Sequence, residues 1–293
     1  MKHLSFSGVC TALVTPFFNG SVNYPLLEQL LRRQIEAGVK TIVLAGTTGE
    51  APTLSDAEKI ELFRRSKEYV GDQCAILAGT GSNSTEHAVL LSQAAQDTGV
   101  DGLLVVTPYY NKATSEGLYA HYLAIAHCVD IPMIVYNVPT RTGVDIPVSV
   151  YQRLSSVPNI IGVKEASSCI TKVTKILTSC PDFAVWTGND DMTVPTISLG
   201  GVGVVSVLSN IFPQETVAMT NAALCGDFAS AAALQRKYQA LIDLLFCEVN
   251  PIPVKAAMRL IGYDCGGCRL PLTSLSNENF ERLSHIIQKK CAP

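Results

Sequence analysis

Eight short runs rich in apolar and β-branched residues recur along the chain, with amphipathic segments between most of them. Such runs, about four to eight residues long, are typical of strands buried on both faces. The expected strands cover residues 9–14, 41–45, 75–79, 102–106, 133–136, 160–164, 183–186 and 203–207. Strands that alternate with helices form parallel sheets, and the number eight favours an α/β fold closed as a (β/α)8 TIM barrel.

The amphipathic segments between these runs are expected to form helices. The four clearest cover residues 24–37, 55–70, 84–98 and 115–128. Ser55 and Glu58 have the spacing of a capping box, and Ser84 and Ser115 are expected N-caps. Three of these segments are followed by a glycine, which readily ends a helix: Gly38, Gly71 and Gly99.

After about residue 225 the strand pattern stops, and residues 228–246, 254–260 and 277–289 are expected helices. We therefore expect a catalytic barrel over residues 1–225 and a C-terminal helical domain over residues 226–293. The competing architecture is an open doubly wound sheet, which usually has a glycine-rich turn after its first strand. Here that position has the sequence VTPF (14–17), which favours the barrel.

The composition points to a protein that acts on small molecules. Hydrophobic residues make up 47% of the chain, and 22 basic residues nearly balance 25 acidic ones without a block of like charge. This argues against nucleic acid or a membrane surface as the partner. Residues 192–214 are uncharged but interrupted by prolines and glycines, so a buried strand with flanking loops fits better than a membrane span. Residues 1–6 lack the apolar core of a secretory signal, and we expect a cytoplasmic protein.

Ten cysteines are spread along the chain, mostly in apolar surroundings. In a reducing compartment such residues behave as small buried hydrophobes. Cys265 and Cys268 are the one local pair with metal-binding or redox spacing, but the sequence has no second pair and no nearby histidine to go with them. We expect neither a metal nor a cofactor, and a structural or incidental role for this pair.

Chemically active residues follow the ends of the expected strands, which form the catalytic face of a (β/α)8 barrel. Lys164 directly follows the uncharged residues 159–163. Burial disfavours the ammonium form, so such a lysine suits the role of a nucleophile. The plain alternative is a lysine that snorkels to solvent or pairs with Glu165. The other strand ends contribute Thr47, Thr48, Tyr109, Tyr110, Tyr136, Arg141, Gly188 and Val205.

One amine, several hydroxyls and one guanidinium on the same face suit Schiff-base chemistry on a small keto acid. The amine attacks the ketone, the hydroxyls move protons, and the guanidinium holds a carboxylate. Taken singly, Tyr136 could be a core aromatic, Arg141 a surface residue, and Thr47-Thr48 a turn. Their occurrence at successive strand ends favours a shared site.

At these positions the sequence resembles the dihydrodipicolinate synthase (4-hydroxy-tetrahydrodipicolinate synthase) family over almost the whole chain. The most specific motifs are GTTGE (46–50), YNVPTRTG (136–143), GVKEA (162–166) and NPIPVK (250–255). The resemblance implies a (β/α)8 barrel with a C-terminal helical region and a lyase of lysine and diaminopimelate biosynthesis that needs no cofactor. It also implies pyruvate and L-aspartate 4-semialdehyde as substrates, and a homotetramer built as a dimer of dimers.

The resemblance assigns a role to each catalytic candidate. Lys164 forms the imine with pyruvate, and Tyr136 is the proton donor and acceptor beside it. Thr47 and Tyr110 complete a hydroxyl relay with Tyr136, and Tyr110 reaches in from a neighbouring subunit.

The same resemblance defines the substrate-binding residues. Thr48 holds the pyruvate carboxylate near the backbone of Val205, Gly188 belongs to the same site, and Arg141 binds the carboxylate of the semialdehyde. N-acetylneuraminate lyases and 2-keto-3-deoxy sugar acid aldolases share the barrel, the lysine and the tyrosine, but a sugar chain needs neutral groups where Arg141 stands. A barrel that only binds a keto acid would be expected to lack the nucleophile or a relay hydroxyl.

Many members of this family are inhibited by lysine at a subunit interface. Matching that interface onto this chain gives a possible regulatory site made of Ala51, Pro52, Asp56, Lys59, Asn83, His87 and Tyr109. In lysine-sensitive bacterial members a glutamate stands at the position of His87, and a histidine at that of Lys59. The lost carboxylate and the added cation disfavour a bound ammonium group. We therefore expect weak or absent inhibition by lysine.

Overall fold

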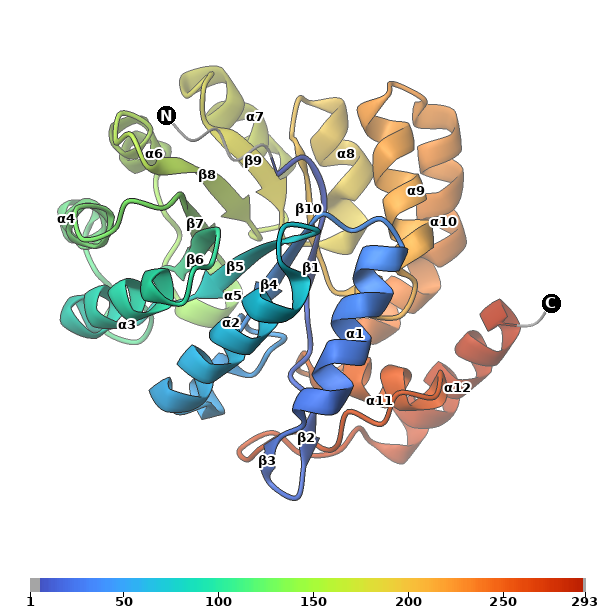
Figure 1. Ribbon diagram of the computed structural model, residues 1–293. Helices are drawn as coiled ribbons and strands as arrows, with labels where there is room; N and C mark the ends of the chain where they lie inside the picture. The colour runs from blue at the N-terminus through green and yellow to red at the C-terminus, as the bar shows by residue number, and fades with distance from the viewer. Residues whose placement is uncertain (1–5, 292–293) are drawn as a thin grey trace.

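A computed structural model describes residues 6–291, and in it eight parallel strands close into a barrel surrounded by helices (Figure 1). Around the barrel the order is β1-β10-β9-β8-β7-β6-β5-β4, so β1 pairs with both β10 and β4. The strands are β1 Gly8–Ala12, β4 Thr41–Leu44, β5 Ala75–Gly79, β6 Gly102–Val106, β7 Met133–Asn137, β8 Ile160–Glu165, β9 Ala184–Thr187 and β10 Gly203–Ser206. Each overlaps an expected strand, and the (β/α)8 fold is confirmed.

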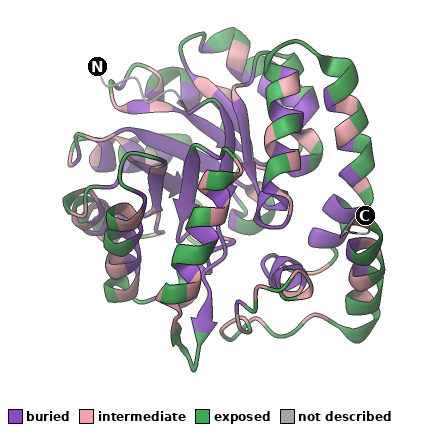
Figure 2. Cartoon of the chain, turned by 45° about the vertical axis from the view of Figure 1, so that its right-hand side comes forward, coloured by how far each residue is buried: buried purple, intermediate pink, exposed green. Residues whose placement is uncertain are grey.

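Helices follow the strands and cover the outside of the barrel. They are α1 Tyr24–Glu36, α2 Asp56–Val70, α3 Thr85–Asp97, α4 Ser115–Ala126, α6 Val148–Leu154, α7 Ile170–Ser179, α8 Thr193–Ser198 and α9 Pro213–Leu224. Smaller elements lie in the loops: β2 Phe17–Phe18, β3 Ser21–Val22, η1 Ala51–Thr53, α5 Pro139–Thr142, η2 Asp190–Met192 and η3 Leu208–Asn210. The strands are largely buried, whereas the helices expose their outer faces (Figure 2).

Alternate residues of the strands belong to two different hydrophobic layers. Ile42 and Leu44 pack outward in the large cluster that includes the helices, whereas Val43 belongs to a smaller cluster of strand residues inside the barrel. This alternation follows from the two-residue period of a strand. The inner cluster also contains Tyr136 and Val205. Candidate site residues therefore project from the same surface that fills the barrel.

The helix ends confirm most of the capping signals and correct one. The capping box of Ser55 and Glu58 is present, and Ser84 accepts a hydrogen bond from the backbone N–H of His87. The expected N-cap Ser115 is wrong: the cap of α4 is Thr114, whose Oγ1 accepts from the N–H of Gly117 at 3.2 Å. Both residues carry a hydroxyl, so the sequence pattern does not distinguish them.

The uncharged segment 192–214 is also only partly a strand with loops. It contains β10, but residues Thr193–Ser198 form helix α8. Pro195 lies in the first turn of α8, where its missing N–H is not needed for an intrahelical hydrogen bond. Among the described residues, no helix combines the length and apolar character needed to cross a membrane.

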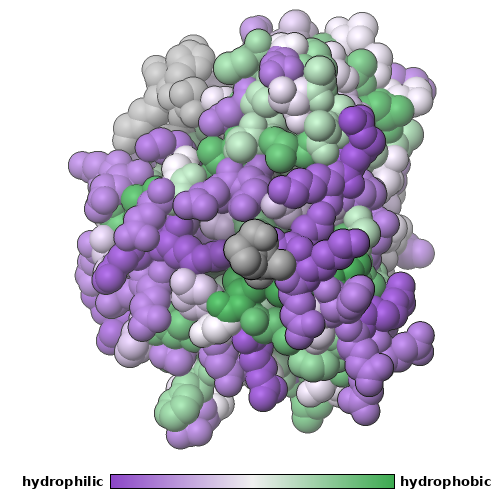
Figure 3. Space-filling view, turned by 90° about the vertical axis from the view of Figure 1, so that its right-hand side faces the viewer, coloured by the Kyte–Doolittle hydropathy of each residue, from purple (hydrophilic) through white to green (hydrophobic). Residues whose placement is uncertain are grey.

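Three further helices follow the barrel: α10 Phe228–Leu245, α11 Ile252–Leu260 and α12 Asn277–Cys291. Helix α10 packs on α8 and α9, and α12 contacts α10 and α11. The face that they form is largely hydrophilic, with smaller hydrophobic areas (Figure 3). The expected domain boundary coincides with Cys225, the C-cap of α9, and stays a prediction.

A buried ion pair joins this helical region to the loop after β4. Lys255 Nζ on α11 lies 2.7 Å from Glu50 Oε1, and both side chains are at most 3% exposed. The second carboxylate oxygen of Glu50 accepts from the backbone N–H of Arg269 at 2.8 Å. A buried carboxylate needs such partners because desolvation strongly disfavours an isolated charge. Helix α11 and the segment after it therefore fix one end of the GTTGE loop.

Lys255→Met should lower the free energy of unfolding by about 3–5 kcal/mol, because it leaves the Glu50 carboxylate buried without its counter-charge. The matched control is Glu116→Gln, which breaks the exposed pair between Glu116 and Arg153. That change should cost less than about 1 kcal/mol. Urea unfolding followed by circular dichroism measures both, and equal losses would contradict a structural role for the buried pair.

Candidate active site

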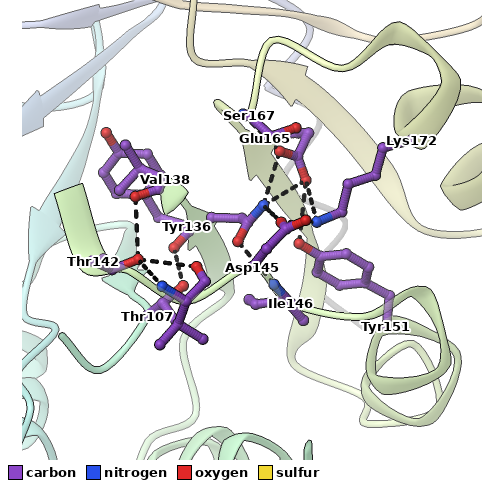
Figure 4. Close-up of polar contacts among 12 residues, drawn as sticks. Thr107, Tyr136, Val138, Thr142, Asp145, Ile146, Tyr151, Glu165, Ser167 and Lys172 are labelled. Carbon is purple, nitrogen blue, oxygen red and sulfur yellow. Dashed lines mark hydrogen bonds and ion pairs between the residues drawn. The ribbon is translucent and has the colours of Figure 1, made fainter. Parts of the chain in front are cut away.

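The carboxyl ends of the strands meet at one mouth of the barrel, where β7 and β8 bring Tyr136 beside Lys164. The two residues are register partners in the parallel pairing. Lys164 Nζ lies 4.0 Å from the centroid of the Tyr136 ring, and each residue is 6% exposed. The backbone of Tyr136 is held as well, because its carbonyl accepts from the Thr107 N–H at 2.9 Å and from Thr107 Oγ1 at 2.8 Å (Figure 4). An amine and a phenol are thus fixed side by side.

Gly188, after β9, leaves room for the lysine side chain. A Cβ atom at this position would lie 2.8 Å from Lys164 Cε and 2.7 Å from the Cβ of Ala166. Both distances are shorter than ordinary van der Waals contact, so any side chain here would displace the lysine. Val205, on β10, is buried in the inner cluster that also contains Tyr136.

The Thr47-Thr48 loop after β4 has an unusual backbone that other parts of the chain hold in place. Ala45 and Glu50 flank it with φ values of 48° and 58°, a left-handed conformation that is strained for residues with a side chain. Thr15 Oγ1 donates to the Gly49 carbonyl at 2.7 Å. Thr48 is 3% exposed, and its Oγ1 accepts from Asn250 Nδ2 at 3.0 Å. The loop is therefore tied to both the first strand's loop and the C-terminal region.

A cavity of about 570 Å³ opens at this mouth of the barrel and joins two sets of expected residues. Its lining includes the active-site candidates Thr47, Tyr136 and Arg141. It also includes most of the possible regulatory site, namely Ala51, Pro52, Asp56, Lys59, His87 and Tyr109. Lys164, Thr48, Gly188, Val205, Tyr110 and Asn83 are outside the lining. Lys164 adjoins the cavity through its contact with the Tyr136 ring.

Arg141 and Tyr110 are the two exposed residues among the expected catalytic and substrate-binding residues. Arg141 lies on the short helix α5, is exposed, and lines the cavity. Tyr110 has a φ of 71° and is 90% exposed, so the structure does not place it in the site of its own chain. Its neighbour Tyr109 is 39% exposed and lines the cavity.

A charged cluster of Asp56, Lys59 and His87 lines the same cavity. Asp56 accepts from His87 Nε2 at 2.7 Å and from Lys59 Nζ at 3.4 Å. Partial burial alone would raise the pKa of Asp56, but the hydrogen bond from His87 and the charge of Lys59 outweigh it and lower that pKa. Ser82 Oγ lies 3.1 Å from the other ring nitrogen of His87. The carboxylate of Asp56 is therefore already engaged by groups of its own chain.

The sequence interpretation missed two side chains that support the site from the C-terminal region. Asn250 and Lys255 belong to the NPIPVK motif, for which the sequence indicates a family resemblance but no role. Their partners are Thr48 and Glu50, about 200 residues earlier in the chain. The available signal was one asparagine and one lysine on either side of the apolar residues 251–254, but it does not identify their partners.

The two cysteines with CxxC spacing have the properties of structural residues. Burial raises the pKa of Cys265 to about 12 and that of Cys268 to about 11, so their thiols are protonated at neutral pH. Within residues 6–291 we find no cluster of three or more histidine, cysteine, aspartate or glutamate side chains that could hold a metal ion.

Comparison with known proteins places the chain in a family. The model of the dihydrodipicolinate synthetase family matches residues 5–290. A 4-hydroxy-tetrahydrodipicolinate synthase from Acetivibrio thermocellus is 44% identical over 289 residues, which cover 98% of each chain. The structure of a chloride-inhibited dihydrodipicolinate synthase from Acinetobacter baumannii complexed with pyruvate is 41% identical, with a TM-score of 0.95 over 97% of this chain and 98% of that one. DHDPS from Cyanidioschyzon merolae with lysine bound is also 41% identical, with a TM-score of 0.94 over 97% of both chains. The chain belongs to the dihydrodipicolinate synthetase family.

Proposed function

We propose that this chain is a 4-hydroxy-tetrahydrodipicolinate synthase that condenses pyruvate with L-aspartate 4-semialdehyde through a Schiff base on Lys164. The observation that carries the proposal is the contact of Lys164 Nζ with the Tyr136 ring at the mouth of the barrel. Curated relatives with this activity in their names, 44–47% identical over nearly the whole chain, support it. The reaction needs only an amine, proton-transfer groups and carboxylate-binding groups.

The first half of the reaction makes a nucleophile from pyruvate. The amine of Lys164 attacks the ketone carbon, and loss of water leaves an imine. Removal of a proton from the methyl group then gives an enamine, with Tyr136 and Thr47 as the proton-transfer groups. Thr48 suits the pyruvate carboxylate, because its oxygen already accepts from Asn250 and its hydroxyl proton remains free to donate.

The second half uses the semialdehyde. The enamine carbon attacks the aldehyde carbon and forms the new carbon–carbon bond. The substrate's own amine then attacks the imine carbon, which closes the ring and releases Lys164. The exposed guanidinium of Arg141 lines the cavity and suits the carboxylate of this second substrate.

The same guanidinium weighs against the sugar-acid lyases and aldolases that share the barrel. A neutral sugar chain offers no carboxylate to the Arg141 guanidinium, whereas the carboxylate of the semialdehyde can pair with it through two hydrogen bonds. The relatives named above carry the synthase name. A barrel that binds a keto acid without catalysis is disfavoured because the amine and all three hydroxyl groups of the expected relay, on Tyr136, Thr47 and Tyr110, are present.

We also propose that the active assembly is a homotetramer, built as a dimer of dimers, in which Tyr110 of one subunit completes the site of its neighbour. The 90% exposure of the Tyr110 side chain in a single chain supports this, because a large aromatic ring is then free to pack against another subunit. The cytoplasmic location stays a prediction.

Lysine inhibition should be weak or absent in this protein. The only carboxylate in the expected regulatory set, Asp56, already accepts from His87 and Lys59. An incoming ammonium group would therefore have to compete with one amine and one imidazole for this carboxylate. Uncompensated burial of a cation beside another cation is unfavourable.

Lys164→Ala should lose nearly all turnover while the fold survives, because the amine forms the covalent bond but contributes little packing. Borohydride reduction in the presence of pyruvate, followed by mass spectrometry, should find the adduct on the Lys164 peptide of the wild type. Lys164→Arg should be equally inactive, since a guanidinium stays protonated. Substantial turnover by Lys164→Ala with an unchanged circular dichroism spectrum would refute the Schiff-base assignment.

The role of Tyr110 is tested by mixing two inactive variants, Tyr110→Phe and Lys164→Ala. After subunit exchange, each mixed pair should contain one site with an intact Lys164 and an intact Tyr110 from the partner, and activity should return. Native mass spectrometry confirms that exchange has occurred. If mixed assemblies form but stay inactive, Tyr110 acts within its own subunit.

Titration of the synthase assay with L-lysine tests the regulatory prediction. We expect half-inhibition above about 1 mM, which corresponds to binding weaker than about −4 kcal/mol. His87→Glu should lower the half-inhibition concentration by about tenfold or more, whereas the matched neutral change His87→Gln should leave it nearly unchanged. Tight inhibition of the wild-type enzyme would show that His87 and Lys59 do not set lysine sensitivity.

A further inference from the structure

We propose that Asn137 and Glu165 are positioning residues, which hold the ends of β7 and β8 so that Tyr136 and Lys164 face each other. The proposal rests on the Schiff-base function above and adds two residues that do not themselves touch the reacting atoms. Both directly follow a catalytic residue in the sequence. Their side chains belong to the opposite face of the strands, since successive residues of a strand point in opposite directions.

The two strands carry two register pairs at their carboxyl ends. Tyr136 pairs with Lys164, and one residue later Asn137 pairs with Glu165. Asn137 Nδ2 donates to both carboxylate oxygens of Glu165, at 2.9 Å and 3.0 Å. Asn137 is fully buried, and the Glu165 side chain is 1% exposed. A charge-assisted bond in such surroundings is strong and has little competition from water.

The pairing of β7 with β8 is irregular before it reaches this point. Met133 pairs with Ile160, but the next residue, Ile134, pairs with Gly162, so the register shifts between them. A bulge of this kind leaves a residue unpaired, disrupts the ladder locally and increases the twist. The alignment at the carboxyl end is therefore not fully set by the first part of the strands. The hydrogen bonds between Asn137 and Glu165 stabilise the alignment of β7 and β8 beyond the bulge.

Neighbouring segments hold this bond in turn. Glu165 Oε1 accepts from the Ser167 N–H at 2.8 Å, and Oε2 accepts from the Tyr151 hydroxyl at 3.3 Å. Lys172 Nζ lies 3.7 Å from Oε2 and also contacts Asp145. The Glu165 carboxylate is thus paired with a cation and several donors, as a buried charge must be.

Both polar atoms of the Asn137 side-chain amide, Nδ2 and Oδ1, form hydrogen bonds. Besides Glu165, Nδ2 donates to Asp145 Oδ1 at 2.8 Å, and Oδ1 accepts from the Ile146 N–H at 3.1 Å. The amide therefore connects three segments, namely the end of β7, the end of β8 and the loop before α6 (Figure 4). Without this amide, β7 loses its side-chain bond to β8 at the level of the catalytic pair.

The effect on the reaction follows from geometry. An amine and its proton-transfer partner react efficiently only when each is held to within about 0.5 Å of the productive geometry. A displacement of about 1 Å from that geometry can lower the rate by about 100-fold. Lys164 and Tyr136 lie on different strands, so their separation depends on the alignment of those strands. Loss of the hydrogen bonds between Asn137 and Glu165 should slow imine formation even though both catalytic groups remain.

The test measures the initial rate of borohydride trapping with pyruvate, together with kcat and the KM for pyruvate. Asn137→Ala should slow trapping and lower kcat by about 10- to 100-fold, with a much smaller change in KM. Glu165→Ala should do the same, whereas Glu165→Gln should retain most of the rate because its amide oxygen still accepts from Asn137. This rescue separates the hydrogen bond from the charge.

The matched control is Asn159→Ala, at the opposite end of β8. Asn159 directly precedes β8, and its Nδ2 donates to the carbonyls of Ala126 at 2.8 Å and Val129 at 2.9 Å, so this change also removes side-chain hydrogen bonds next to this strand. Thermal unfolding monitors the stability of both variants. We expect a comparable loss of stability but a trapping rate within about twofold of wild type, because Asn159 is far from the aligned pair.

The outcomes separate this proposal from the function on which it rests. If wild type forms no trapped adduct on Lys164, the Schiff-base function fails. If wild type is trapped and folded Asn137→Ala is trapped at the same rate, the function stands and the positioning role is wrong. The role is equally wrong if Asn137→Ala and Asn159→Ala slow trapping by the same factor, since general loosening of the barrel would then explain both.

Discussion

Closure of the sheet by pairing of β1 with β10 is the constraint on which the site depends. Gly8 and Gly203 are register partners, and a Cβ atom at Gly203 would lie 2.0 Å from the Gly8 carbonyl oxygen. Only glycine permits this approach of the two backbones. Once the sheet closes, eight parallel strands end around one mouth, and residues as distant in sequence as Thr47 and Lys164 reach the same region.

The barrel alone does not fix the geometry of this mouth. The Thr47-Thr48 loop is flanked by residues in the left-handed conformation, which persists only where surrounding structure enforces it. Part of that enforcement comes from α11 and the segments around it, through Lys255 on Glu50 and Asn250 on Thr48. The helical region is therefore part of the active site's support.

The sequence predicted the strands, the capping box and the order of the strand-end residues because these depend on local patterns of period two or 3.6. It could not choose between adjacent hydroxyls at the start of α4, and it did not recognise α8. It also left Lys164–Glu165 open as a surface pair. In the structure Glu165 is turned away from the lysine's face and bonded to Asn137, a contact between strands that no local pattern encodes.

The cavity also differs in charge from the protein as a whole. The chain has a formal net charge of −3, yet the cavity lining contains two basic residues, Arg141 and Lys59, against one acidic residue, Asp56. Of the two proposed substrates, pyruvate is an anion and L-aspartate 4-semialdehyde is a zwitterion, so a locally positive mouth raises mainly the concentration of pyruvate near Lys164. Because the Debye length is about 8 Å at physiological ionic strength, this attraction acts close to the mouth and weakens as salt is added. The same positive balance that favours an anionic substrate disfavours a cationic effector such as L-lysine, so the proposed substrate binding and the expected weak inhibition share one physical basis.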